Sequence, residues 1–224
     1  MERYLDKELT ELEKMLLFMA GLVEESIAKS LQALRRLDAG LARQVIDEDD
    51  RINALELSVD DKCLDLIALH QPMAIDLRFI AMSMKISTDL ERIADLSVDI
   101  SERTLELEGK PQLKPLIDIP KLADLSQRMV KDAIDAFVHR DTDLAKSVIL
   151  RDAEADDLRN LVQSELINDF MTKDPSTAPR AVPLLLVARH LERICDHATN
   201  IAEAVFYMVK AEVIKHRTDT LKEN

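Results

Sequence analysis

The sequence predicts an all-α protein made of two tandem three-helix bundles, six long helices in all, and three observations predict it. Only 3 Gly, no Trp and 3% aromatic residues accompany 47% hydrophobic residues, a composition typical of long helices with few tight turns. Apolar residues recur at helical spacing along most of the chain. Finally, the segment Leu90–Ile93 returns letter for letter as Leu191–Ile194, 101 residues later. A repeat of roughly 100 residues indicates a duplicated bundle rather than a solenoid, whose units run about 20–50 residues.

The first half is predicted to hold three helices. The first runs from about Arg3 to Leu37, and Gly40 is expected to supply its left-handed cap. The second covers about 41–69 and ends before Pro72, because the residue before a proline disfavours helix. The third, about 74–108, carries the first copy of the repeated segment.

The second half repeats this plan after a linker that contains three prolines. Helices are expected at about 121–139 and 143–171, and a last one reaches about Lys215. Pro183 is expected in the first turn of that last helix, where a missing N–H is tolerated. The predicted units are residues 1–108 (first repeat), 109–120 (linker), 121–216 (second repeat) and 217–224 (C-terminal tail).

The charge of the chain excludes some partners. A net charge of −13 and a pI near 4.9 argue against nucleic-acid binding and against unaided attachment to an anionic membrane. The apolar run 15–23 is too short to span a bilayer, so no direct membrane insertion is expected. Two distant cysteines, Cys63 and Cys195, favour a reduced, cytoplasmic protein.

Each copy of the repeat places acidic residues on one helical face. Glu91, Asp95 and Asp99 follow one another in the third helix, and Glu192 and Asp196 lie in the sixth. Acids four residues apart lie on the same side of a helix, where two like charges cost about 0.2–0.5 kcal/mol per pair. We therefore expect a positive group over them, either an arginine or a metal ion.

The preceding helices supply partner acids. Asp152 and Asp156 in the fifth helix correspond to Asp49 and Asn53 in the second, at a shift of 103 residues. Facing helices that both offer carboxylates can bind hard cations, which prefer oxygen ligands. The alternative is a solvated acidic face with ion pairs to the nearby arginines, Arg51, Arg92 and Arg193.

No catalytic constellation is found in the sequence. A di-iron carboxylate bundle uses Glu-x-x-His, and no glutamate here has a histidine three residues later. His190 and His197 are expected at the surface or at helix flanks. The chain is predicted not to be an enzyme. A carboxylate-bundle metal-dependent enzyme and a metal-free helical scaffold are the alternatives.

The sequence resembles the PhoU family, the accessory and signalling proteins of phosphate-specific transport. The resemblance covers essentially the whole chain and rests on Leu90–Asp95, on Leu191–Asp196 and on the segment Gln71–Arg78. It implies a cytoplasmic homodimer, recruited by its partners to the inner face of the cell membrane. It also implies two partners, the ATPase of the phosphate ABC transporter and a phosphate-sensing histidine kinase. The implied role is negative regulation of the starvation response when phosphate is plentiful.

Family members can also carry iron or other metal clusters through Glu/Asp-x-x-x-Asp motifs. The resemblance therefore implies metal ions, in the first place iron, with zinc, nickel or another divalent ion as the alternative. Three motifs carry over completely, and the fourth pairs Asp49 with Asn53, which brings no charge. The second half is therefore predicted to be the better metal site. The predicted ligands are Asp49, Glu91, Asp95, Asp99, Asp152, Asp156, Glu192 and Asp196.

Overall fold

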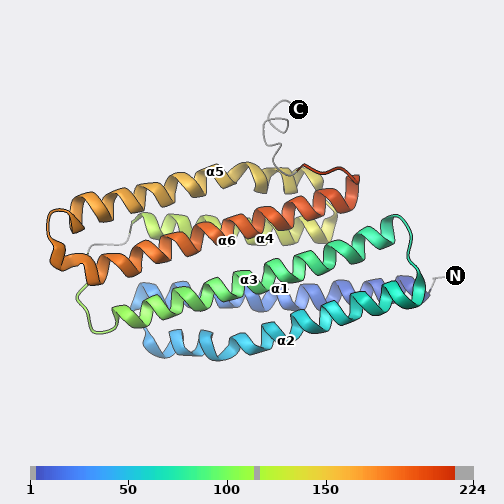
Figure 1. Cartoon of the computed structure of the whole chain (residues 1–224), viewed down its shortest axis with the longest axis horizontal. Helices are drawn as coiled ribbons and strands as arrows, with labels where there is room; N and C mark the ends of the chain where they lie inside the picture. Colours follow the sequence, from blue (N-terminus) through green and yellow to red (C-terminus); the bar gives the residue numbers. More distant parts are fainter. Residues whose placement is uncertain (1–3, 114–116, 215–224) are drawn as a thin grey trace.

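The computed structural model describes residues 4–113 and 117–214, and in these ranges it contains helices and no strand. The predicted all-α class and the two tandem three-helix repeats are confirmed (Figure 1). A π-helix, Leu166–Met171, extends the fifth α-helix, and a 3₁₀ turn, Pro175–Thr177, precedes the sixth. The α-helices are α1 (Tyr4–Arg36), α2 (Ala39–His70), α3 (Ile75–Leu107), α4 (Asp118–His139), α5 (Thr142–Glu165) and α6 (Ala178–Lys210).

The two repeats lie side by side along their lengths, with α3 against α6 (Figure 1). One hydrophobic core runs through both repeats. Leu90 and Ile93 of α3 and Leu191 and Ile194 of α6 are all fully buried in it. The repeated Leu-Glu-Arg-Ile segment therefore contributes both to the core and to the surface. Its apolar residues fill the core, and its Glu and Arg turn toward a face of each bundle.

The connection between the first two helices of each repeat contains an aspartate that caps the following helix. Asp38 Oδ1 accepts from the Leu41 N–H at 3.0 Å, and Asp141 Oδ1 accepts from the Leu144 N–H at 3.0 Å. The residues just before these aspartates, Leu37 and Arg140, adopt positive φ. The prediction that Gly40 is the left-handed cap is wrong, because Asp38 starts α2 two residues earlier and Gly40 lies inside that helix.

Pro183 lies in the second turn of α6, not in the first as predicted, because the helix begins at Ala178. A proline has no N–H, so the Pro179 carbonyl, four residues earlier, loses its helical partner. Lys110 Nζ donates a hydrogen bond to this carbonyl at 3.1 Å. A lysine that follows α3 thus satisfies the backbone group that the proline frees, and it ties the two repeats together.

The helix ends differ from the prediction by a few residues. α4 begins at Asp118, so Pro120 belongs to its first turn, where proline is tolerated. α6 ends at Lys210, and Ala211 takes the left-handed conformation. The predicted end near Lys215 and the tail 217–224 lie outside the described residues. Within the described ranges, no helix has a segment long and apolar enough for a membrane span.

Candidate metal centre

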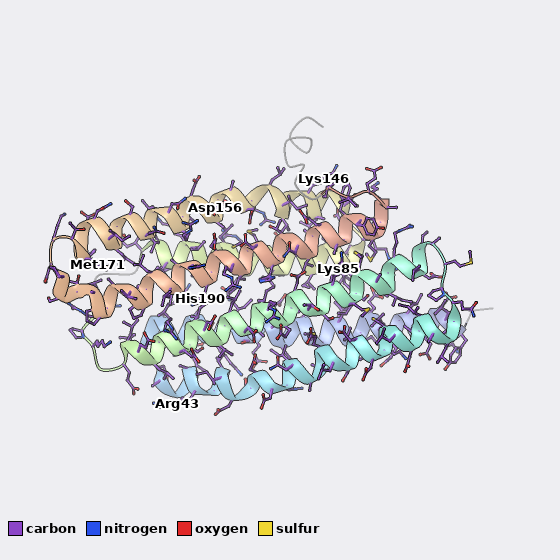
Figure 2. The ribbon with its side chains drawn as sticks, viewed as in Figure 1. Arg43, Lys85, Lys146, Asp156, Met171 and His190 are labelled. Atoms are coloured by element: carbon purple, nitrogen blue, oxygen red, sulfur yellow. The ribbon has the colours of Figure 1, made fainter. Side chains whose placement is uncertain are left out.

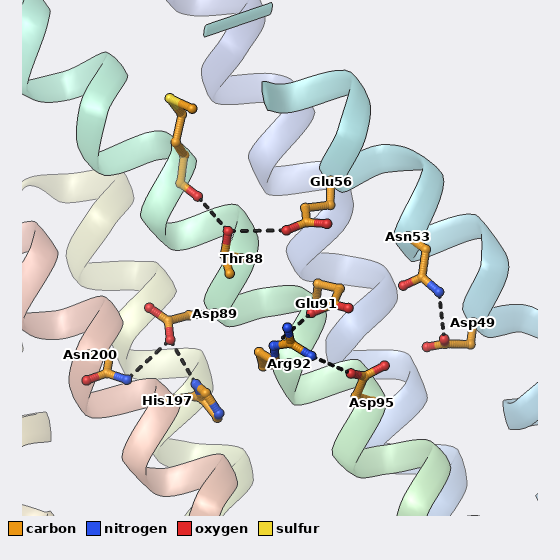
Figure 3. A network of polar contacts seen from close by, with 11 residues as sticks. Asp49, Asn53, Glu56, Thr88, Asp89, Glu91, Arg92, Asp95, His197 and Asn200 are labelled. Atoms are coloured by element: carbon orange, nitrogen blue, oxygen red, sulfur yellow. Dashed lines mark hydrogen bonds and ion pairs between the residues drawn. The ribbon is translucent and has the colours of Figure 1, made fainter. Parts of the chain in front are cut away.

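The first candidate site lies between α2 and α3 (Figure 3). Asn53 Nδ2 donates to Asp49 Oδ2 at 3.0 Å, and Glu91 and Asp95 lie on the facing helix. Three buried oxygens here, Asp49 Oδ1, Asn53 Oδ1 and Glu91 Oε2, accept no hydrogen bond. Buried polar atoms are nearly always hydrogen-bonded, so three such oxygens in one place single out this face of the bundle.

Arg92 supplies the positive charge at this site. Its Nε lies 3.4 Å from Glu91 Oε2, and its NH1 donates to Asp95 Oδ2 at 3.2 Å (Figure 3). Its side chain is 55% exposed, so it reaches over the acids from the solvent side. Burial raises the pKa of Glu91 and of Asp49, and the negative charge of Asp95 raises both further. The carboxylates therefore crowd one another at partial burial, with one exposed arginine as compensation.

The second candidate site lies between α5 and α6 and retains four acids. Arg159 NH2 lies 3.5 Å from both Asp156 Oδ1 and Glu192 Oε1, so it bridges the two helices. Figure 2 shows Asp156 on α5, above α6. Burial raises the pKa of Asp196 to about 6, and the charges of Glu192, Asp152 and Asp156 add to the effect. Four carboxylates thus interact electrostatically around one arginine.

Arg159 was missed by the sequence reasoning, whose alternative to a metal named Arg51, Arg92 and Arg193 as the partners of the acids. Of these three, Arg92 pairs with the acids, whereas Arg51 stacks over the Phe18 ring at 5.1 Å. A usable signal for Arg159 was present, because it follows Asp156 by three residues and so shares its helical face.

Asp99 is not brought into the first acidic site. Its Oδ2 lies 3.3 Å from His190 Nδ1 of α6. In the same way, Asp89 Oδ1 lies 2.8 Å from His197 Nδ1 and 3.2 Å from Asn200 Nδ2 (Figure 3). Of the two expected places for these histidines, the surface and the helix flanks, the structure excludes the surface. Their side chains are only 13% and 17% exposed, because they fill the seam between the repeats.

The donor chemistry of both sites fits a hard cation. Every candidate donor is an oxygen, most of them are anionic, and the first site has three unsatisfied ones. In the described part of the chain, however, no three acidic, histidine or cysteine side chains converge as a ready ligand set. In this structure Arg92 supplies the positive charge at the first site and Arg159 supplies it at the second.

The comparisons with known proteins cover nearly the whole chain. The PhoU domain matches twice, at residues 16–104 and 119–205. A phosphate-specific transport system accessory protein PhoU homolog from Aquifex aeolicus is 42% identical over 211 residues, which cover 94% of this chain and 95% of that protein. A Pseudomonas putida homolog with the same description is 38% identical, over 93% of this chain and 82% of its own length.

Two solved structures have the same architecture. The crystal structure of PhoU from Pseudomonas aeruginosa superposes with a TM-score of 0.89 at 38% identity, over 92% of this chain and 99% of that one. The phosphate transport system regulatory protein PhoU from Streptococcus pneumoniae gives 0.88 at 30% identity, over 94% and 99%. The duplicated acidic helices, the paired bundles and these likenesses agree: the chain belongs to the PhoU family.

Proposed function

We propose that this protein is a non-enzymatic adaptor that restrains the phosphate ABC importer and its sensor histidine kinase when phosphate is plentiful. The PhoU match over both repeats carries this proposal, because the relatives are named as accessory or regulatory proteins of phosphate transport. The proposed partners are the transporter ATPase and the kinase. The proposed setting is the cytoplasm, with the protein acting as a homodimer that its partners recruit to the inner face of the membrane.

The acidic faces give this adaptor a second proposed property, the binding of metal, in the first place iron. The proposed ligands are Asp49, Glu91 and Asp95 in the first repeat and Asp152, Asp156, Glu192 and Asp196 in the second. A bound cation would supply the charge that offsets repulsion between facing carboxylates. The side chains themselves would hold α2 against α3, and α5 against α6, at fixed spacing.

Metal content tests this part directly. Protein purified without chelators should carry metal, and Glu192→Ala/Asp196→Ala should lose the larger share, because the second repeat keeps all four acids. Glu91→Ala/Asp95→Ala is the matched variant in the first repeat and should lose the smaller share. The measurement is metal per chain by elemental analysis. Equal, near-zero content in the wild type and in both variants would refute metal binding.

Deletion of the gene tests the regulatory role. In phosphate-rich medium the deletion strain should show alkaline phosphatase activity at least about tenfold above the wild type, since the kinase loses its restraint. Expression of the gene from a plasmid should restore repression. A deletion strain that stays repressed would contradict negative regulation.

A further inference from the structure

The outer face of α2 carries leucines where a bundle surface is normally polar. Leu57 is 65% exposed and Leu64 is 55% exposed. They are seven positions apart, so they lie on one stripe of the helix, with Ala54 one turn before Leu57 and Ala68 one turn after Leu64. The buried residues of α2, such as Val59 and Leu66, lie on the opposite side. These leucines therefore contribute nothing to the core.

The sister repeat shows that the fold does not need a leucine at the position of Leu57. At the shift of 103 residues that aligns Asp49 with Asp152, Leu57 corresponds to Asn160 and Ala54 to Asp157. Both of these residues are exposed on α5, which packs in its own bundle as α2 does. Leu64 corresponds to Ile167, which is 37% exposed, so the polar replacement is limited to the part of the stripe around Leu57. The apolar stripe on α2 calls for another explanation, and exposed apolar patches commonly mark interaction sites.

The corner between α2 and α3 is also more apolar than the corresponding corner before α6. Leu69 and Met73 are 75% and 80% exposed, and Ile75 is 56% exposed. Ala74 has φ 50° and ψ −108°, a conformation that strains an L-residue and is often retained for function. The matching corner before α6 reads Lys173-Asp174-Pro175-Ser176, which is polar. Of these two corners, only the one in the first repeat exposes large apolar side chains.

Three exposed carboxylates lie along the same face as the leucines. Asp50, Asp61 and Asp65 are exposed on the same side of α2, and Asp61 lies between the two leucines. In the described part of the chain, no hydrogen bond or ion pair engages these three carboxylates. Lys62, the neighbouring cation, is already paired with Glu8 on α1. The face therefore combines exposed leucines with carboxylates, and Asp61 lies one turn from each leucine.

We propose that this face of α2 binds an amphipathic helix of a partner protein, one whose apolar stripe is flanked by Lys and Arg. Leucines of the two helices would interdigitate, and the basic flanks would meet Asp50, Asp61 and Asp65. A second copy of this chain fits poorly, because it would bring the same aspartates face to face. An anionic membrane is repelled for the same reason. The inference rests on the adaptor role proposed above and names the chemistry of its partner.

A peptide probe tests the docking face on the purified full chain. The probe is a labelled helical peptide of about 20 residues, with leucine at the heptad core positions and lysine on the flanks. Its affinity is measured by fluorescence anisotropy. Leu57→Asn/Leu64→Asn and, separately, Asp61→Asn/Asp65→Asn should each weaken binding about tenfold or more. The same peptide with glutamate in place of lysine should not bind.

Two controls on the sister repeat match these variants. Leu161→Asn removes a leucine that is 51% exposed on α5, and Asp143→Asn/Asp157→Asn removes the same number of charges. Both should change the affinity by less than about twofold. All altered side chains are exposed, so folding, checked by circular dichroism, should be unaffected. Equal affinity in the Leu57/Leu64 variant and in the Leu161 control would overturn the proposal.

Complementation separates this proposal from the regulatory one. If deletion of the gene derepresses alkaline phosphatase, Leu57→Asn/Leu64→Asn should fail to restore repression, whereas Leu161→Asn should restore it. Full restoration by the double variant would refute the docking face and leave the regulatory role standing. If the deletion strain stays repressed, the regulatory role fails, and the peptide measurement alone decides on the docking face.

Discussion

Phe137→Ala is expected to lower the free energy of unfolding by about 3–5 kcal/mol, the usual cost of deleting a buried phenyl ring. Phe137 of α4 is 2% exposed, and its ring stacks on Phe79 of α3 with 5.9 Å between centroids and 16° between planes. The contact crosses from one repeat to the other. Its loss removes apolar burial, leaves a cavity and weakens the junction. Urea unfolding followed by circular dichroism measures the effect.

Phe18→Ala is the matched control for this substitution. Phe18 is 50% exposed on α1 and is covered on one side by Arg51. Its removal should cost less than about 1 kcal/mol. If both alanine variants unfolded at the same urea concentration, the rings would not pack as described.

Asp196→Asn is expected to stabilise the protein at neutral pH. The folded-state pKa of Asp196 is raised to about 6, so the folded protein opposes its ionisation. A carboxyl whose pKa is higher in the folded state costs stability as pH rises from its ordinary range, near 4, to the raised value. The amide avoids that cost. The variant should match the wild type near pH 4 and exceed it above pH 6, by about 1 kcal/mol after allowance for solvent screening.

Thermal or urea unfolding across this pH range, in chelated buffer, measures the difference between Asp196→Asn and the wild type. Asp143→Asn is the control, because that carboxylate is 92% exposed. It should give a difference that is small and independent of pH. A pH-independent difference for Asp196→Asn as well would show that the four acids do not interact. Metal added at pH 7.5 should raise the stability of the wild type more than that of Asp196→Asn, because only the wild type keeps the full set of proposed ligands.

The helices and their duplication could be predicted because they depend on local pattern. Helical spacing of leucine and isoleucine located the six segments, and the repeated Leu-Glu-Arg-Ile related the halves. The helix ends were less certain. Asp38 marks the first turn by capping α2, and this signal was outweighed by the expectation that Gly40 would end the first helix. A cap that belongs to the following helix can look, in sequence, like the end of the preceding one.

The arrangement of the candidate sites could be predicted only in part. Helical spacing placed Glu91 with Asp95 and Glu192 with Asp196, because residues four apart share a face. It could not assign Asp99 to His190, or Asp89 to His197, because those pairs depend on how α3 crosses α6. The position of Pro183 raised a similar difficulty. The destabilisation that Pro183 causes in α6 depends on Lys110, a residue far away in sequence that donates a hydrogen bond to the freed Pro179 carbonyl.

The seam between α3 and α6 has a consequence for self-assembly. Its contacts are reciprocal under the repeat: Asp99 meets His190, which is the counterpart of Asp89, and Asp89 meets Asn200, the counterpart of Asp99. The repeats therefore meet like the subunits of an isologous dimer, with a short linker that supplies a millimolar effective concentration. Two copies of the first repeat would instead set Asp89 against Asp99, acid against acid. In this structure α6 therefore occupies the face of α3 that a second copy of the first repeat would need.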